Sequence, residues 1–231
     1  MNLFAIGDLH LSHEANKPMD IFGTQWCGHE EKIKKNWETL VTSEDIVLVP
    51  GDISWAMRLN EATKDLAWLE RLPGKKVCIK GNHDYWWDRT GPLNKLYEGV
   101  YFLQNTAYFI GDLAICGTRG WAVSSSDLLT REDEKMIARE CIRLKLSLDE
   151  ACKKGCKAIW VLLHYPPCGE KSGQSPFIEL IKAYPVTRVI YGHLHDEENW
   201  KHAMMGLYEG IHYQLVSADY LEFKPLWIAE V

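Results

Sequence analysis

Short apolar runs rich in β-branched residues recur along the chain, and each of them ends in a cluster of polar residues. Continuous apolar runs of this length are typical of strands that are buried on both faces. The runs that end in polar clusters are Leu3–Ile6, Ile46–Val49, Val77–Ile79, Ala158–Leu163 and Val186–Tyr191. Further strands, antiparallel in part, are predicted at Tyr101–Phe102, Ala107–Ile110, Leu113–Cys116 and within residues 212–230.

Helical periodicity fills the segments between these runs. Apolar side chains fall on one face of Glu30–Leu40 and of Leu59–Leu72. The longest predicted helix, Glu132–Lys154, has Thr130 as its N-cap and ends at Gly155. Alternating strands and helices indicate an α/β protein, and the number of strands covered on both faces indicates two packed sheets flanked by helices.

The polar clusters are expected to meet in space. In open α/β sheets, ligands bind outside the carboxyl ends of the strands. Each cluster follows the carboxyl end of its predicted strand. The sequence therefore predicts one functional site that is built from several strand ends.

The residue types in the clusters favour metal binding. Asp and Asn after a strand are often only turn residues, but turn formation has no need of imidazole. Imidazoles, carboxylates and a carboxamide without a thiolate favour a borderline divalent ion such as Mn, Fe, Co, Ni or Zn. The side chains in question are Asp8, His10, Asp52, Asn82, His83, His164, His193 and His195.

The number of these groups predicts two ions. Seven of these eight side chains as ligands already exceed what one catalytic ion commonly takes from a protein, whereas one shared carboxylate among the seven would give each of two ions four ligands. Asp8 and Asp52 do not neutralise two divalent cations, so the site is expected to attract an anion such as a phosphate ester. The paired ions are expected to lower the pKa of a bridging water and to hold the phosphate oxygens during in-line attack.

Composition narrows the classes of function. The chain has 231 residues, 46% of them hydrophobic, which is enough for one domain spanning residues 1–231. Its net charge of −6 makes a nucleic-acid polymer an unexpected partner, because such binders rely on Lys and Arg. Neither a leader peptide nor a membrane span is predicted. The seven Cys include no Cys-x-x-Cys pair, so a cytoplasmic location with reduced thiols is expected.

The order of the clusters resembles a known signature. They are Asp8-x-His10, Gly51-Asp52, Gly81-Asn82-His83-Asp84, His164 and Gly192-His193-x-His195. This series resembles the signature of the calcineurin-like metallophosphoesterase superfamily, and the short chain is similar to its small, stand-alone bacterial branch of predicted phosphohydrolases. Gly-Asn-His-Asp and Gly-His-x-His are the specific parts. The resemblance implies an α/β fold, a four-layer α-β-β-α sandwich of two mixed β-sheets, with two metals at its top.

The resemblance also implies a role for each residue. His83 matches the family histidine that contacts the phosphate and protonates the leaving oxygen, and Asp52 matches the bridging carboxylate, so these two are the expected catalytic residues. Asn82 is expected to contact the substrate as well. Manganese is the metal expected to serve in vitro. The first metal would be held by Asp8, His10 and His195, the second by Asn82, His164 and His193, and both by Asp52.

Two positions depart from other branches of the superfamily. At the position that corresponds to Trp55 of this chain, protein Ser/Thr phosphatases carry an Asp that orients the catalytic His, and purple acid phosphatases carry a Tyr ligand. This chain has Trp55, so both identities are disfavoured and the partner of His83 is left open. Hydrolases of the lipid A pathway carry Arg where this chain has His83, which argues against that substrate.

Arginines and aromatic residues near the clusters are candidates for substrate binding. Arg58 and Arg119 have the forked donors that clamp a phosphate. The segment Trp121–Thr130 is expected to form a loop over the site and to act as a lid. Nearby aromatic residues either stack a planar leaving group or pack beneath loops: Trp55, Tyr85, Trp86, Trp87, Trp121 and Tyr165. The histidines without a matching context are expected to be non-ligands: His13, His29, His202 and His212.

The expected function is two-metal hydrolysis of a phosphate mono- or diester in a small phosphorylated substrate. A phosphodiesterase for cyclic nucleotides or other small diesters is a close alternative. A non-catalytic interaction scaffold on the same fold is disfavoured because no ligand is missing. A nuclease like the double-strand-break repair member is disfavoured because only 36 residues, 196–231, follow His195 and because the chain is acidic.

Overall fold

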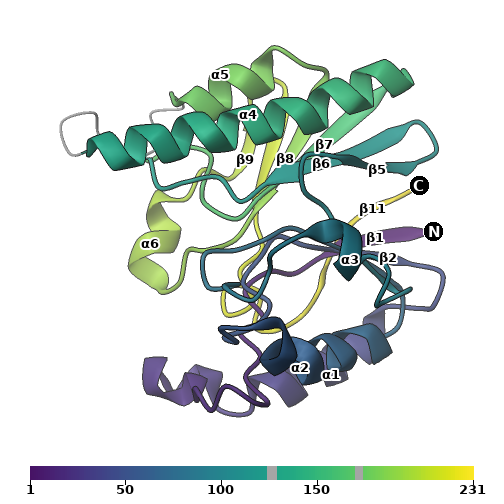
Figure 1. The fold of residues 1–231 in the computed structure, drawn as a ribbon, viewed down its shortest axis with the longest axis vertical. Coiled ribbons are helices and arrows are strands. Elements are labelled where there is room, and N and C mark those ends of the chain that lie inside the picture. Colours follow the sequence, from purple (N-terminus) through teal and green to yellow (C-terminus); the bar gives the residue numbers. More distant parts are fainter. Residues whose placement is uncertain (124–128, 170–173) are drawn as a thin grey trace.

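Two β-sheets pack face to face, and helices cover the outer face of each sheet (Figure 1). The computed structural model describes residues 1–123, 129–169 and 174–231. The expected sandwich of two mixed sheets between helical layers is confirmed. The predicted lid segment Trp121–Thr130 includes Ser124, Ser125 and Ser126, which lie outside the described residues.

The first sheet has five strands in the described part of the chain. Its central strands run parallel, and the edge strand β11 is antiparallel to β1. In spatial order the strands are β11 (Leu226–Glu230), β1 (Asn2–Ala5), β2 (Ile46–Val49), β3 (Lys75–Cys78) and β4 (Val100–Phe102).

The second sheet has six strands among the described residues. Its four central strands are parallel, and β5 and β9 add antiparallel edges. In spatial order the strands are β5 (Ala107–Ile110), β6 (Leu113–Thr118), β7 (Ala158–Leu163), β8 (Val186–Tyr191), β10 (Ile211–Leu215) and β9 (Gly206–Tyr208).

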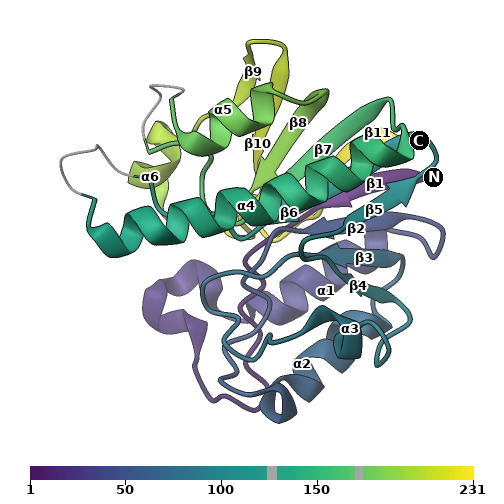
Figure 2. The same cartoon turned by 45° about the horizontal axis from the view of Figure 1, so that its top comes forward.

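The helices form the outer layers, as Figures 1 and 2 show. The first sheet is covered by α1 (His29–Leu40), α2 (Leu59–Arg71) and the short α3 (Thr90–Leu93). The second sheet is covered by α4 (Arg131–Lys154) and α5 (Pro176–Lys182), with α6 (Glu197–His202) at one end. Two 3₁₀ turns, η1 (Met19–Phe22) and η2 (Thr24–Trp26), precede α1. None of the described helices is long and apolar enough to cross a membrane.

The alternation of strand side chains explains the layers. Leu3 and Ala5 of β1 join the apolar cluster between the sheets, whereas Phe4 joins the cluster under α1 and α2. Both faces of this strand are therefore buried, which is why its sequence is continuously apolar. Fully burying a Leu or Phe side chain contributes about 1.5–3 kcal/mol. The strands hence hold the two sheets and both helical layers together.

The predicted caps and end of α4 are confirmed, and the helix begins at Arg131, one residue before the predicted Glu132. The Thr130 side chain accepts a hydrogen bond from the Asp133 backbone N–H, and the Asp133 carboxylate accepts one from Thr130 in return. Gly155 ends the helix with φ of 76°, a conformation that favours glycine. The short helices α5 and α6 were not predicted. The described residues of α6 include no buried side chain, so no apolar period marks it.

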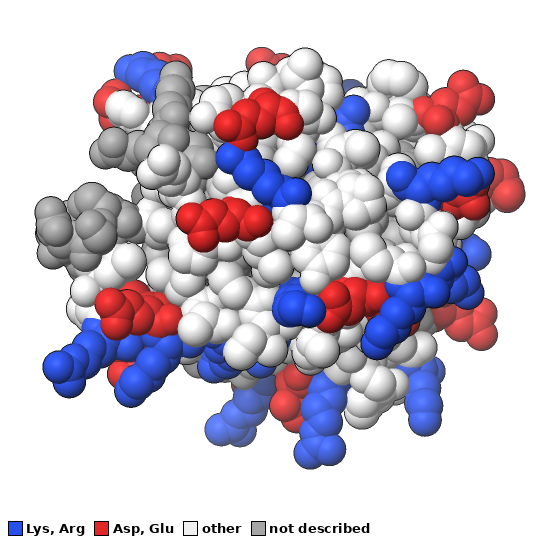
Figure 3. Space-filling model, turned by 90° about the horizontal axis from the view of Figure 1, so that it is seen from above, with Lys and Arg blue, Asp and Glu red and all other residues white. Residues whose placement is uncertain are grey.

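Acidic and basic side chains are interspersed on the face that carries α4 and α5 (Figure 3). A surface that binds a nucleic-acid polymer gathers Lys and Arg on one patch or stripe. This face shows no such separation of the charges.

Candidate metal centre

The loops after strands of both sheets meet at one edge of the sandwich. The loops that follow β1 and β2 run side by side, because the Asp8 N–H donates to the Gly51 carbonyl and the His10 N–H to the Asp52 carbonyl. The sheets are joined by the His193 N–H, which donates to the Asp8 carboxylate at 3.0 Å. Strand ends that are distant in sequence are thus fixed in one place.

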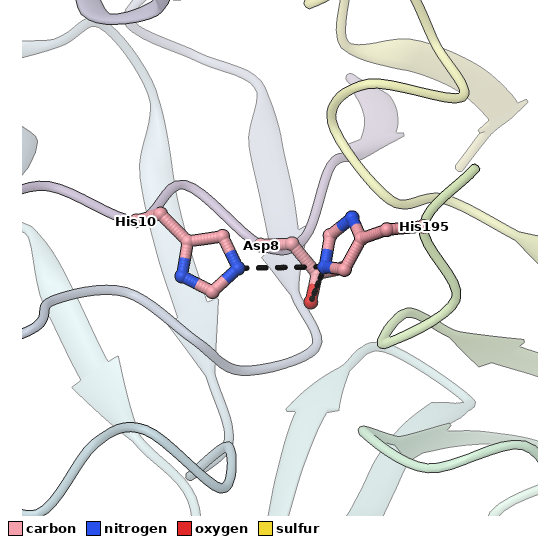
Figure 4. Close-up of side chains that lie close together, drawn as sticks. All are labelled: Asp8, His10 and His195. Atoms are coloured by element: carbon pink, nitrogen blue, oxygen red, sulfur yellow. Dashed lines mark hydrogen bonds and ion pairs between the residues drawn. The ribbon is translucent and has the colours of Figure 1, made fainter. Parts of the chain in front are cut away.

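Asp8, His10 and His195 form the first group of candidate ligands (Figure 4). The Nε2 atoms of His10 and His195 are 3.4 Å apart. His195 Nε2 lies 3.7 Å from Asp8 Oδ1. Figure 4 shows the two imidazole rings facing each other, with the Asp8 carboxylate beside His195. These donor atoms converge closely enough to share one metal ion.

A second group surrounds His164. Its Nε2 lies 2.6 Å from Asn82 Oδ1, 3.2 Å from His193 Nδ1 and 3.4 Å from Asp52 Oδ2. Asp52 Oδ2 also lies 3.9 Å from His10 Nε2 in the first group. All seven predicted ligands are therefore brought together, and Asp52 stands between the two groups.

The hydrogen bonding around His164 shows that a cation fits here. His164 Nδ1 lies 3.0 Å from the Pro50 carbonyl, which can only accept, so Nδ1 carries the proton. Burial lowers the pKa of His164 to about 3, which keeps the ring neutral and leaves a lone pair on Nε2. That lone pair faces oxygens of Asn82 and Asp52, neither of which donates. A cation among these acceptors would satisfy all of them.

The buried carboxylates give the same indication. Burial raises the pKa of Asp8 to about 8, and it raises the pKa of Asp52 to about 6. Both side chains are almost completely inaccessible to solvent. Buried carboxylates are costly unless they are paired or bind metals. Divalent cations would therefore stabilise the ionised forms of Asp8 and Asp52.

Four of the seven candidate ligands have a strained backbone. The φ angles are 56° for Asp8, 48° for His10, 52° for Asp52 and 72° for His193, all in the left-handed region. Non-glycine residues there cost energy and cluster at functional sites. The strain is compensated in part by hydrogen bonds, such as that from the His83 N–H to Asp52 Oδ1 at 2.8 Å.

Glycines make room for the two carboxylates. A Cβ atom on Gly81 would collide with the Asp52 carboxylate and with its backbone nitrogen. A Cβ atom on Gly192 would collide with the Asp8 carboxylate. Both glycines are therefore required by close approach, which adds a physical reason for the Gly-Asn-His and Gly-His motifs.

Gly81→Ala is expected to displace Asp52 and to lower metal content to less than about half of the wild-type value, with a loss of stability of about 1–3 kcal/mol. The matched control is Gly91→Ala, where no atom lies within 4 Å of the new Cβ. Metal analysis and thermal unfolding of both variants check this expectation. Full metal content in Gly81→Ala would contradict the close approach.

Asp84 braces the same loops without facing the ligands. Its carboxylate accepts hydrogen bonds from the backbone of Ile53 at 2.9 Å and of Gly81 at 2.8 Å, and from Trp86 Nε1 at 3.1 Å. The loop that carries Asp52 is thus tied to the loop that carries Asn82. Asp84, the last residue of the Gly-Asn-His-Asp motif, therefore has a structural role.

Asp219 is a site residue that sequence analysis missed. Its Oδ1 lies 2.9 Å from His195 Nδ1. Burial opposes protonation of His195, but the hydrogen bond with Asp219 and the charge of Asp8 raise the pKa of this histidine to about 9, so its surroundings attract a cation. The signal was present in the sequence, because Asp219 follows strand β10 as the other clusters follow their strands. Such a carboxylate fixes the histidine tautomer with Nε2 toward the metal.

Asp219→Asn is expected to weaken metal binding by about 10–100-fold, because the second partner of a metal-binding histidine typically has that effect. The metal affinity of the variant is measured by titrating metal into the protein in a calorimeter. Asp112→Asn, at an exposed surface carboxylate, is the control and is expected to bind metal as the wild type does. Equal affinities in the two variants would refute the role of Asp219.

The remaining predicted site residues lie around this centre. His83 is half-buried and lines the same cavity as His10, His193 and His195. Arg119 lies beside His164, whose backbone N–H donates to the Arg119 carbonyl at 3.0 Å. Arg58 is exposed at the start of α2, and neither Arg58 nor Arg119 is among the residues that line the cavity.

Some of the aromatic residues near the clusters pack in the core, and others lie at the cavity or beside the candidate ligands. Trp86 and Trp87 are buried in the core under the first sheet, so they pack rather than bind. Trp55 lines the cavity, its ring centroid 4.9 Å from that of His10 and 4.1 Å from that of His83. Tyr165 packs on His193 with ring centroids 4.2 Å apart.

The four histidines expected not to bind metal lie outside both groups of candidate ligands. His13 pairs instead with Asp65 at 2.6 Å and with Glu30 at 3.2 Å. His29 Nε2 lies 3.1 Å from the Leu9 carbonyl.

Sequence comparison finds relatives for parts of the chain. It is 34% identical over 111 residues to the Gene 66 protein of Mycobacterium phage D29, a match that covers 46% of this chain and 53% of that protein. It is 31% identical over 109 residues to the uncharacterized protein MJ1445 of Methanocaldococcus jannaschii, covering 44% of this chain and 56% of that protein. The matches thus span about half the length of these relatives.

Comparison with solved structures and with a family model covers more of the chain. The protein of unknown function AQ665 from Aquifex aeolicus has a TM-score of 0.50 and 17% identity, over 98% of this chain and 95% of that one, which shows the fold alone. Phosphopantetheinyl hydrolase from Mycobacterium tuberculosis has a TM-score of 0.49 and 18% identity, over 94% and 88%. The sequence model of the calcineurin-like phosphoesterases matches residues 1–197, which include every predicted ligand. The chain belongs to the calcineurin-like phosphoesterase family, a family of metal-dependent hydrolases of phosphate esters.

Proposed function

We propose that this protein hydrolyses a phosphate mono- or diester in a small molecule with the help of two divalent cations. The observation that carries the proposal is the convergence of acceptor atoms from both sheets on one edge. Asp8, His10 and His195 form one group, and Asp8, Asp52 and His164 form a second. Asp52 Oδ2 approaches His10 Nε2 in the first group as well as His164 Nε2. Family membership supports the reaction class.

The proposed ligands divide between two cations. Asp8, His10 and His195 would hold one, and Asn82, His164 and His193 would hold the other. Asp52 would serve both, because its Oδ2 approaches ligand nitrogens of both groups, His10 Nε2 and His164 Nε2. Asp8 also belongs to the second group, but its contact with His164 at 3.9 Å is to Nδ1, which the Pro50 carbonyl already binds. When bound, the cations supply positive charge opposite the phosphate and a more acidic water; manganese is proposed to serve in vitro.

His83 is proposed to donate a proton to the leaving oxygen. The His83 ring lines the cavity beside Trp55, and His83 belongs to neither group of candidate metal ligands. Burial lowers the pKa of His83, and nearby Lys17 acts in the same direction, while the Asp52 carboxylate opposes both. The lowered pKa disfavours the protonated ring that a proton donor needs, and the Asp52 carboxylate favours it. The ring lies in the cavity next to the centre. No side-chain hydrogen bond orients it among the described residues, so Trp55 packing holds it instead.

Arg119 is proposed to contact a phosphate oxygen. Its Nε and Nη2 atoms are buried without a hydrogen-bond partner among the described residues, although Glu140 lies 3.9 Å from Nη2. The guanidinium packs on Trp121 with its carbon 4.7 Å from the ring centroid. Buried donors left without partners are costly, and a phosphate would satisfy them. Asn82 is proposed to contact the substrate as well.

Metal-loaded protein tests the proposal. The protein is purified, its metal content is measured, and aryl phosphate mono- and diesters are assayed with Mn, Fe, Co, Ni or Zn and with excess chelator. We expect two metal ions per chain and hydrolysis that the chelator abolishes. Folded protein that binds at most one ion and cleaves neither ester class would favour the interaction scaffold. The ratio of monoester to diester turnover decides between phosphatase and phosphodiesterase.

A further inference from the structure

An apolar wall adjoins the proposed metal centre. A cavity of about 330 Å³ opens between the metal-facing histidines and the segment that contains η1 and η2. One side of the cavity is polar and includes His83 and His195. The other side is apolar and is made by Met19, Phe22, Trp26 and Trp55.

Aromatic rings line the wall, and Lys17 Nζ lies over the Trp55 ring, 4.8 Å from its centroid. Trp55 Nε1 donates to Met19 Sδ at 3.1 Å, so its polar group is already used. The Phe22 ring lies nearly parallel to the Trp55 ring, with an angle of 7° between the planes and 6.4 Å between the centroids. Phe22 is nevertheless 58% exposed. A large aromatic side chain left in solvent and aligned with a second ring is not explained by core packing.

The wall is continuous with the proposed proton donor. The Trp55 ring touches His83, with ring centroids 4.1 Å apart, and Phe22, aligned with Trp55, lines the same cavity. A substrate whose leaving oxygen faces His83 would therefore place the rest of its leaving group along Trp55 and Phe22. The cavity volume is large enough for one or two fused rings.

We propose that the cavity beside His83 selects phosphate esters whose leaving group carries a flat aromatic ring, with Phe22 and Trp55 as the binding wall. This inference rests on the proposed hydrolysis, because it assigns the leaving-group side of the same site. Flat rings favour offset or edge contacts with aromatic side chains, which a short alkyl or sugar group does not provide. Phe22 is the specificity-determining residue, since it touches no candidate metal ligand in the described contacts.

A matched pair of substrates tests the proposal. Naphthylmethyl phosphate and ethyl phosphate both release a primary alkoxide, so their intrinsic reactivity is similar and the ring is the main difference. We expect the manganese-loaded wild type to prefer the ring substrate about 10-fold or more in kcat/KM. Phe22→Ala is expected to reduce that preference about 5-fold, chiefly through KM. The control is Ile21→Ala, an exposed neighbour in η1 that does not line the cavity and is expected to keep the preference.

Binding gives a readout that does not depend on turnover. Equilibrium dialysis measures the affinity of naphthylmethylphosphonate, which cannot be hydrolysed, for the wild type and both variants, with and without manganese. Weaker binding in Phe22→Ala alone supports the ring site even if no ester is cleaved, in which case only the proposed hydrolysis fails. Cleavage of both esters with equal efficiency, together with binding that Phe22→Ala does not change, would overturn the ring site and leave the hydrolysis standing.

Discussion

Asp52→Asn is expected to lower kcat/KM by about 10³-fold or more and to leave less than two metal ions per chain. Asp52 Oδ2 approaches His10 Nε2 at 3.9 Å and His164 Nε2 at 3.4 Å, so one carboxylate serves both groups. An amide keeps the shape but loses the charge that two cations share. Metal-assisted charge stabilisation is worth several kcal/mol, and each 1.4 kcal/mol is about tenfold in rate.

The stability of this variant separates the loss of metal from misfolding. Burial raises the pKa of Asp52 to about 6, so the ionised carboxylate destabilises the metal-free protein at pH 7. Asn removes that charge, and its Oδ1 still accepts from the His83 N–H. Metal-free Asp52→Asn is therefore expected to unfold at the wild-type temperature or above. Full activity and two metal ions in this variant would rule out the bridging role.

His83→Ala is expected to keep both metal ions and to lose about 10²–10⁴-fold in kcat, the usual contribution of a general acid. The imidazole lines the cavity but belongs to neither group of candidate ligands. The loss should be largest for esters with poor leaving groups, because these depend most on protonation. A series of aryl and alkyl phosphates measures the dependence on the leaving group, and metal analysis measures retention.

The control for the histidine change is His202→Ala, since His202 is exposed on α6 and pairs there with Glu198. Its rates are expected to equal those of the wild type. If His83→Ala lost the same factor for good and poor leaving groups, the ring would have a role in binding rather than in proton transfer. If it lost its metals, the assignment of the ligands would need revision.

The sequence by itself determined the sheets and the edge at which the site lies. Ile46–Val49 and Ala158–Leu163 are apolar throughout because both faces of each strand are buried, whereas Val186–Tyr191 also contains Thr187 and Arg188, which are not buried. The observed limits of all three strands match the prediction. The polar residues after them needed no tertiary knowledge, because the carboxyl ends of parallel strands meet at one edge. Local pattern therefore predicted which candidate ligands come together.

Only the tertiary structure decided how those residues are supported. Asp219 reaches His195 across 24 residues of sequence, and no local pattern shows such a contact. Trp55 and Trp87 are both tryptophans close to the polar clusters in sequence, but Trp87 lies in the core and Trp55 on the cavity wall. Hydrophobic pattern reports that a side chain is buried but not what it is buried against, since packing partners come from other strands and loops. Secondary structure was thus determined locally, whereas the environment of each ligand was determined by the long-range packing of the two sheets.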